Sequence, residues 1–287
     1  MRATTKLKLV YLGVAALDTW LAGASAGSRA AGATRAGRLA RAGRLVTKPA
    51  LMPLLAGSFA ASPNARRSPL RTTTLAGQAF GWGGDVALLG HGTRSFAIGT
   101  GCFGVGHAAY ISGFLRHRSS RPFLRSLPTR MSIRLWVGAG PVMALAAARQ
   151  ERLLGPAVAA YTGLLAGTFA TAGHLDPALP ASARRLSAAG AGLFLVSDTV
   201  LGLRQFVLPA VAPGLLREAS RARLDAALER TVMGTYAAAQ LLLAEGAARQ
   251  GRVRGREDGR AGQAQWPTRR FPCSGGRGSR TTTVSPN

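Results

Sequence analysis

The sequence predicts an all-α fold, a polytopic bundle of about eight transmembrane helices with a disordered C-terminal tail. Only 17% of the 287 residues are charged, against 47% that are hydrophobic. The charges fall in clusters between long runs of Ala, Leu, Gly and Val, which is typical of membrane proteins. From Ala247 onward large apolar residues are scarce, and such a composition does not support a packed core. We therefore expect a transmembrane domain over residues 1–246 and a basic, disordered tail over 247–287.

The net charge of +26 could indicate a nucleic-acid-binding protein. The arginines, however, lie between apolar runs and not along one face that also carries aromatic residues. We therefore expect contacts with lipid phosphates and no nucleic-acid partner. Cys102 and Cys273 form neither a disulfide framework nor a metal-binding motif, and we expect no metal and no cofactor.

Eight apolar runs define the expected helices, several of them long enough to cross a bilayer. The runs are Leu7–Gly23, Leu45–Ala61, Thr72–Gly90, Ser95–Leu115, Ile133–Ala148, Leu153–Gly173, Leu186–Phe206 and Thr231–Gly246. The second, fifth and eighth are short, so a count of seven spans stays open.

The N-terminal run resembles a cleavable signal peptide, but its Asp18 is unusual for a signal sequence and similar runs follow, so we expect a retained helix. Asp18 has no recognisable partner in the sequence. The segment Ser28–Val46 is rich in Ala, Gly and Arg and could be an interfacial helix, but we expect a solvated basic loop. Pro49 then restricts the first turn of the second span, with Lys48 at its entrance.

Two apolar runs each contain one acid, Asp85 in the third span and Asp198 in the seventh. A carboxylate near the centre of a membrane helix costs about 2.5–3.5 kcal/mol, so such an acid usually faces a partner or a cavity and is a functional candidate. Spans three and seven run in the same direction in an alternating bundle, which brings the two acids to a similar depth. The alternative is a structural role, in which each acid pairs with a neighbouring Ser, His or Arg.

Polar side chains on inward-facing helix surfaces are candidates for substrate contacts. Phe103, His107 and Tyr110 share one face of the fourth span, and Tyr236 and Gln240 stack one turn apart in the eighth. A lone His on an apolar face is more often a packing residue than a catalytic one. The candidate substrate-binding residues are Lys48, His107, Tyr110, Tyr161, Tyr236 and Gln240.

Three short motifs are better explained by packing or chance. GASAG at residues 23–27 matches a hydrolase elbow without the required strand, and GTGCFG at 99–104 matches a dinucleotide fingerprint inside an apolar helix. His174 and Asp176 could ligate a metal but have no third ligand at helical spacing, and we expect a loop pair.

Charge in the short loops gives no preference between the two orientations. Five arginines that follow the last span favour cytoplasmic termini: Arg249, Arg252, Arg254, Arg256 and Arg260. We thus expect a multi-pass protein of the cell membrane.

Five segments, in this order and spacing, resemble the YhhN-like lysoplasmalogenase family. They are TKPALMPLL (47–55), GWGGDVALL (81–89), FGVGHAAY (103–110), LFLVSDTVLG (193–202) and TYAAAQLLL (235–243). The resemblance covers roughly residues 7–246 and implies an integral membrane enzyme of about eight helices. It further implies hydrolysis of the vinyl ether bond of lysoplasmalogens, giving a fatty aldehyde and a glycerophospho-base. The long basic linker, the arginine-rich segment at 203–230 and the tail depart from a compact member of that family.

The resemblance places the family's two acids on Asp85 and Asp198 and its lysine on Lys48. A vinyl ether hydrolyses through proton transfer to carbon and an oxocarbenium ion, so one neutral carboxylic acid and one carboxylate are needed. The sequence does not say which Asp is which. We expect Lys48 to bind the phosphate of a lysophospholipid substrate, among surrounding membrane lipids. A membrane transporter or channel that uses the acids as proton or cation sites is the alternative, and a non-catalytic scaffold is a third.

Overall fold

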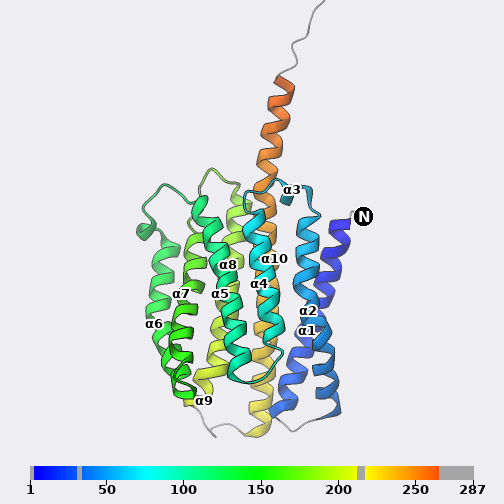
Figure 1. The fold of residues 1–287 in the computed structure, drawn as a ribbon, viewed down its shortest axis with the longest axis vertical. Coiled ribbons are helices and arrows are strands. Elements are labelled where there is room, and N and C mark those ends of the chain that lie inside the picture. The colour runs from blue at the N-terminus through cyan, green and yellow to red at the C-terminus, as the bar shows by residue number, and fades with distance from the viewer. Residues whose placement is uncertain (1–2, 31–33, 212–216, 265–287) are drawn as a thin grey trace, which may run out of the picture.

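Eight long helices run alternately up and down and pack side by side in one bundle (Figure 1). The structure is a computed structural model that describes residues 3–30, 34–211 and 217–264. The long helices are α1 (Ala3–Ala30), α2 (Arg35–Ala60), α4 (Arg71–Ala87), α5 (Gly92–Arg116), α6 (Leu127–Gln150), α7 (Leu154–Ala172), α8 (Ala181–Gly202) and α10 (Glu218–Ala264). The short elements are α3 (Pro63–Arg66), a 3-10 turn (Phe123–Arg125), a π-helical turn (Leu203–Val207) and α9 (Leu208–Val211).

The architecture confirms the all-α prediction, and the described residues contain no strand beyond one isolated bridge between Arg118 and Leu175. In the described ranges, each of the eight expected spans lies wholly or mostly within one long helix, which favours eight helices over seven. The start of α1 and the far end of α10 lie at the same end of the bundle (Figure 1). The segments GASAG and GTGCFG lie within α1 and α5, which leaves neither a preceding strand.

The expectation of a solvated loop over Ser28–Val46 was wrong. Helix α2 begins at Arg35, because the alternation of Ala, Arg and Leu suits a helix and Thr34 caps its N-terminus. The Thr34 hydroxyl accepts a hydrogen bond from the amide of Gly37 at 3.1 Å. Most of the basic linker is therefore the first half of α2, and Arg44 is buried in the bundle.

The expected tail also differs at its start, because α10 does not end at Gly246 and continues to Ala264. The side chains of Ala247 and Gln250 are buried, and the hydroxyl of Ser68 donates a hydrogen bond to the carbonyl of Ala247 at 2.7 Å. The segment after α3 thus packs against the turn that follows Gly246. Residues 265–287, also expected to be disordered, lie outside the described residues.

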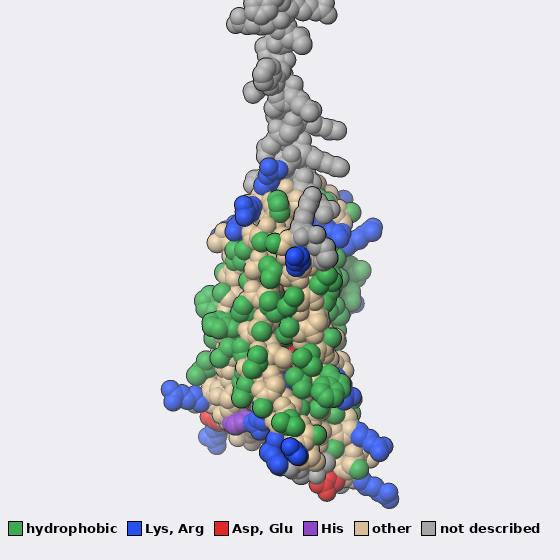
Figure 2. Space-filling view, turned by 90° about the vertical axis from the view of Figure 1, so that its right-hand side faces the viewer, with side chains coloured by type: hydrophobic (Ala, Val, Ile, Leu, Met, Phe, Trp, Pro, Cys, Tyr) green, Lys and Arg blue, Asp and Glu red, His purple; other side chains and the backbone are tan. Residues whose placement is uncertain are grey.

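The sides of the bundle are apolar, as expected of a membrane protein. Figure 2 shows hydrophobic side chains over the middle of one face, with Lys and Arg gathered toward its two ends. Among the described residues, three helical stretches are by themselves long and apolar enough to cross a membrane, Ala3–Ser28, Leu127–Gln150 and Ala181–Ala210. Exposed side chains such as Trp20 and Val137 would be unfavourable in water over so wide a surface and suit contact with lipid.

Glycines let the helices that carry the two acids approach their neighbours closely. A methyl group on Gly84, next to Asp85, would come within 2.5 Å of the Phe103 ring on α5. A methyl group on Gly190 of α8 would come within 2.9 Å of the Ala239 carbonyl on α10. Small residues at such crossings are the usual means of close packing between membrane helices. The first contact holds α4 close to α5, and the second holds α8 close to α10.

Candidate active site

An internal cavity lies between helices α2, α4, α5, α6, α7, α8 and α10. Its wall is mostly apolar, and the charged side chains on it are Lys48, Asp85 and Asp198. The hydroxyl groups of Tyr161 and Tyr236 also belong to side chains of the wall. A largely apolar cavity with a few convergent polar groups is typical of a small-molecule or lipid site.

Asp85 lies on α4, two residues before the end of that helix, and only 1% of its surface is exposed. The hydroxyl of Tyr236 on α10 donates a hydrogen bond to Oδ2 of Asp85 at 2.7 Å. The ammonium Nζ of Lys48 on α2 lies 3.8 Å from Oδ1. A buried carboxylate needs such partners, because removing an ion from water is costly unless a countercharge and hydrogen bonds replace the water.

Two prolines in α2 help to place Lys48 against α4. Pro53 has no amide hydrogen, so the carbonyl of Pro49 lacks its usual partner one turn later. The indole nitrogen of Trp82 on α4 donates to this carbonyl at 3.0 Å. This bond joins α2 to α4 immediately beside Lys48 and three residues before Asp85.

Lys48 was expected at the entrance of the second span, but the helix that carries it begins well before that point. Because α2 begins thirteen residues earlier, at Arg35, Lys48 lies near the middle of its helix, about 20 Å from the helix start. The side chain is 7% exposed and reaches the cavity. Its nearest charged neighbour is the carboxylate of Asp85.

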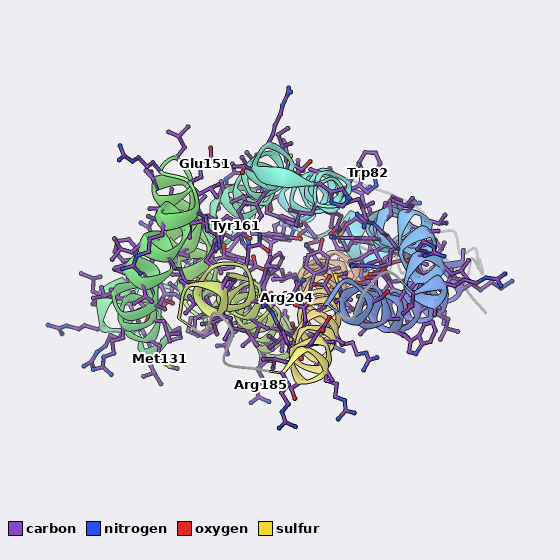
Figure 3. All side chains as sticks on the ribbon, turned by 90° about the horizontal axis from the view of Figure 1, so that it is seen from below. Trp82, Met131, Glu151, Tyr161, Arg185 and Arg204 are labelled. Atoms are coloured by element: carbon purple, nitrogen blue, oxygen red, sulfur yellow. The ribbon has the colours of Figure 1, made fainter. Side chains whose placement is uncertain are left out.

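Asp198 lies on α8 and lines the same cavity as Asp85. The hydroxyl of Tyr161 on α7 donates a hydrogen bond to Oδ2 of Asp198, and Figure 3 shows Tyr161 on the inner side of the bundle. The neighbouring Ser197 donates to the carbonyl of Val232 at 3.0 Å, which fixes α8 against α10 at this level. In the described part of the chain, no lysine or arginine forms an ion pair with Asp198.

The surroundings of Asp85 and Asp198 are alike in one respect and differ in another. Each accepts a hydrogen bond from a tyrosine, and an aromatic chain joins the two tyrosines through Phe194 and His107. The ring centroids are 5.4 Å apart for Tyr236 and Phe194, 4.5 Å for Phe194 and His107, and 5.7 Å for His107 and Tyr161. All three pairs meet edge to face, a favourable geometry for aromatic rings. Within the part of the chain that the structure describes, Asp85 has a cation beside it and Asp198 has none.

Three of the candidate binding residues lie outside the cavity wall. Tyr110 donates a hydrogen bond to Oε1 of Gln240 at 3.0 Å, so these two residues satisfy each other inside the core. His107 is buried, and its Nδ1 lies 3.0 Å from the hydroxyl of Thr168. Because that hydroxyl donates to the carbonyl of Leu164, Nδ1 of His107 is the donor in the pair. These contacts match the packing role that a lone histidine usually has.

The structure also contains a buried ion cluster that was not predicted from the sequence. Arg44 pairs with Asp18 of α1, at 3.4 Å, and with Glu229 of α10, at 2.9 Å. Arg204 of the π-helical turn pairs with Glu229 and Asp225, and Figure 3 shows it pointing inward. Asp18 thus has a partner after all. The sequence carried one sign of this cluster, since Arg44 and Lys48 are four residues apart and lie on one helix face. That face exists only if the helix begins before Arg44.

The polar groups on the cavity wall are suited to acid–base chemistry. No group of three His, Cys, Asp or Glu side chains in the described ranges is placed to hold a metal ion. His174 contacts the carbonyl of Arg121 and Asp176 accepts a bond from the amide of Ala178, as a loop pair would. Two carboxyl groups in one apolar cavity, one beside a cation and one without, can hold different protonation states.

Comparisons with known proteins identify the family. The YhhN family model matches residues 43–247, which includes both acids and Lys48. The comparison with curated proteins gave no match, and neither did the comparison with solved structures. Because the matched segment covers well over half of the chain, this protein belongs to the YhhN family.

Proposed function

We propose that this protein is a membrane-embedded hydrolase that cleaves the vinyl ether bond of a lysoplasmalogen. The observation that carries the proposal is the pair Asp85 and Asp198 on one apolar cavity, of which only Asp85 has a cation beside it. Membership in the YhhN family and the resemblance to its lysoplasmalogenases support the substrate class. The apolar wall suits a lipid chain.

The unequal surroundings assign the two acids. Lys48 stabilises Asp85 as a carboxylate. Asp198, without a cationic partner among the described residues, is the neutral acid that donates a proton. The hydrogen bond from Tyr161 holds the carboxyl group of Asp198 in one orientation, and that from Tyr236 does the same for Asp85. Lys48 is then a charge partner of Asp85 and not the phosphate ligand expected from the sequence.

The reaction follows from these roles. Asp198 transfers its proton to the β-carbon of the vinyl ether, and the ether oxygen and its attached carbon become an oxocarbenium ion. The carboxylate of Asp85 offsets that positive charge in the apolar cavity. Water adds to the cationic carbon and returns a proton to Asp198, and the hemiacetal formed then separates into a fatty aldehyde and the glycerophospho-base.

Isotope incorporation tests this reaction. In deuterated water, the aldehyde released by the purified protein should carry one deuterium on the carbon next to the carbonyl, and in ¹⁸O-labelled water the label should enter the aldehyde oxygen. An ester-linked lysophospholipid of the same chain length should not be cleaved. A protein that releases no aldehyde but moves protons or cations across vesicles, and loses that flux in Asp85→Asn and Asp198→Asn, would be the transporter instead.

We further propose that all eight long helices cross the cell membrane, with both termini on the cytoplasmic side. The alternating directions of the helices and the shared end of α1 and α10 support this topology. The arginines at the far end of α10 favour the cytoplasm for that end.

A further inference from the structure

The cavity wall on α6 includes two side chains that also face outward. Leu135 is 48% exposed and Trp136 is 45% exposed, yet both line the cavity. Burial of the two acids also differs: Asp198 and its partner Tyr161 are half-buried, whereas Asp85 is fully buried. Leu135 and Trp136 are both exposed and part of the wall, so the cavity opens to the outside at α6.

The contacts of α6 locate this opening. Along α7 the seam is closed, because a methyl group on Gly140 would come within 3.4 Å of the Thr162 hydroxyl and one on Gly155 within 2.9 Å of Ala148. Near its C-terminal end, α6 also packs closely on the end of α8: a methyl group on Gly202, the last residue of α8, would come within 2.9 Å of the sulfur of Met143. The other side chains of α6 on the cavity wall include Leu135, Trp136 and Ala139, and they share that wall with Leu195 and Thr199 of α8.

We propose that the slot between α6 and α8 is a lateral portal that holds the hydrocarbon chain of a single-chain lipid. Leu135, Trp136 and Ala139 border it on α6, and Leu195 and Thr199 border it on α8. Four of these five side chains are apolar, and their level in the bundle is the apolar belt that suits lipid. Figure 3 shows Met131, one turn before Leu135, on the outer side of the bundle and Tyr161 on the inner side.

The residues at the inner end of the slot suggest the orientation of a lipid chain within it, with the polar end of the lipid innermost. Thr199 directly follows Asp198, so the inner end of a chain in the slot lies beside that carboxyl group, with the tail toward the bilayer. Another part of the cavity wall is formed by the rings of Phe96 and Phe206, which meet edge to face with centroids 5.3 Å apart. This inference rests on the proposed function, because it names the route of that substrate.

A photolabelling experiment tests the portal without catalysis. The probe is a lysophospholipid with a saturated ether-linked chain that carries a diazirine, which the enzyme cannot hydrolyse. On the full-length protein in vesicles, adducts should concentrate on the slot residues of α6 and α8, and an excess of unlabelled saturated ether lipid should remove them. Labelling spread evenly over the exposed apolar surface, or unchanged by the competitor, would overturn the portal.

A bulky substitution gives a second readout. Ala139→Phe should narrow the slot and raise KM for long-chain substrate about tenfold, which corresponds to excluding about two methylene groups. Cleavage of a short-chain vinyl ether, which does not fill the slot, should change less than cleavage of the long-chain substrate. Val142→Phe is the matched control, because Val142 lies on the same helix, is exposed and does not line the cavity. Ala139→Leu serves if the Phe variant does not fold.

The two proposals fail differently. A wild-type protein that releases no aldehyde but is labelled in the slot would keep the portal and reject the hydrolase. Normal chain-length dependence in both Ala139 variants, together with aldehyde release, would keep the hydrolase and reject the portal.

Discussion

The ammonium of Lys48 lies 3.8 Å from Oδ1 of Asp85, inside the bundle and near the middle of α2. Asp198, on the same cavity, accepts a hydrogen bond from Tyr161 but has no such cation in the described part of the chain. This difference between two acids of the same type lets one be a carboxylate while the other is a proton donor. It is the basis of the predictions below.

Lys48→Gln should lower kcat by at least about 100-fold with a smaller change in KM, because the charge partner of Asp85 contributes to the transition state and not to lipid binding. Lys48→Arg should restore part of the loss, since it keeps the positive charge. Steady-state kinetics on the two variants check this. A rise in KM with unchanged kcat would return Lys48 to the phosphate-binding role that the sequence suggested.

Tyr161→Phe should lower kcat about tenfold while KM stays the same, because the hydrogen bond that orients the carboxyl group of Asp198 is worth about 1.5 kcal/mol at most. Tyr110→Phe is the control. It removes a buried hydrogen bond to Gln240, and neither residue lines the cavity, so it should lower thermal stability but not kcat. Equal activity losses in both variants would indicate general damage to the bundle.

Arg44→Ala should be among the most destabilising single changes, by about 3–5 kcal/mol, because it leaves Asp18 without its countercharge inside the bundle and removes one of the two arginines that pair with Glu229. Thermal unfolding in detergent measures the effect, with Arg35→Ala, an exposed change on the same helix, as the reference. An Arg44→Ala protein as stable as that reference would mean that the ion cluster is not structural.

Reporter fusions after residues 30, 120 and 260 check the topology. Residues 120 and 260 should report the same side of the membrane, and residue 30 the opposite side, because in the proposed topology α1 crosses once and the later helices alternate. Opposite sides for 120 and 260 would exclude eight crossings.

The sequence predicted the bundle well because long apolar runs leave the chain few alternatives to membrane helices. Asp85 and Asp198 stood out for the same reason, since an isolated charge is conspicuous in such a run. What lies beside them was harder to predict. The exclusion of Tyr110 and Gln240 from the cavity depends on helix rotation, and an inward-facing pattern does not distinguish a core contact from a cavity wall.

The errors about α2 have one cause. Its first half is rich in arginine and was expected to be a loop, so the charged face of Arg44 and Lys48 was not recognised. Arginine is a good helix former, and its charge is compatible with burial when acids from two other helices meet it. Such partners, Asp18 and Glu229, are distant in the sequence and become visible only in the fold.

The most direct test of the account is the rate of aldehyde release by Asp85→Asn, Asp198→Asn and the double variant, each purified and shown to be folded. Asn keeps the size of Asp but removes both the charge and the donated proton. Each single variant should lose at least about 100-fold in kcat, and the double variant about as much as either, because members of one catalytic unit are not additive. Near-normal aldehyde release from either folded single variant would contradict the mechanism.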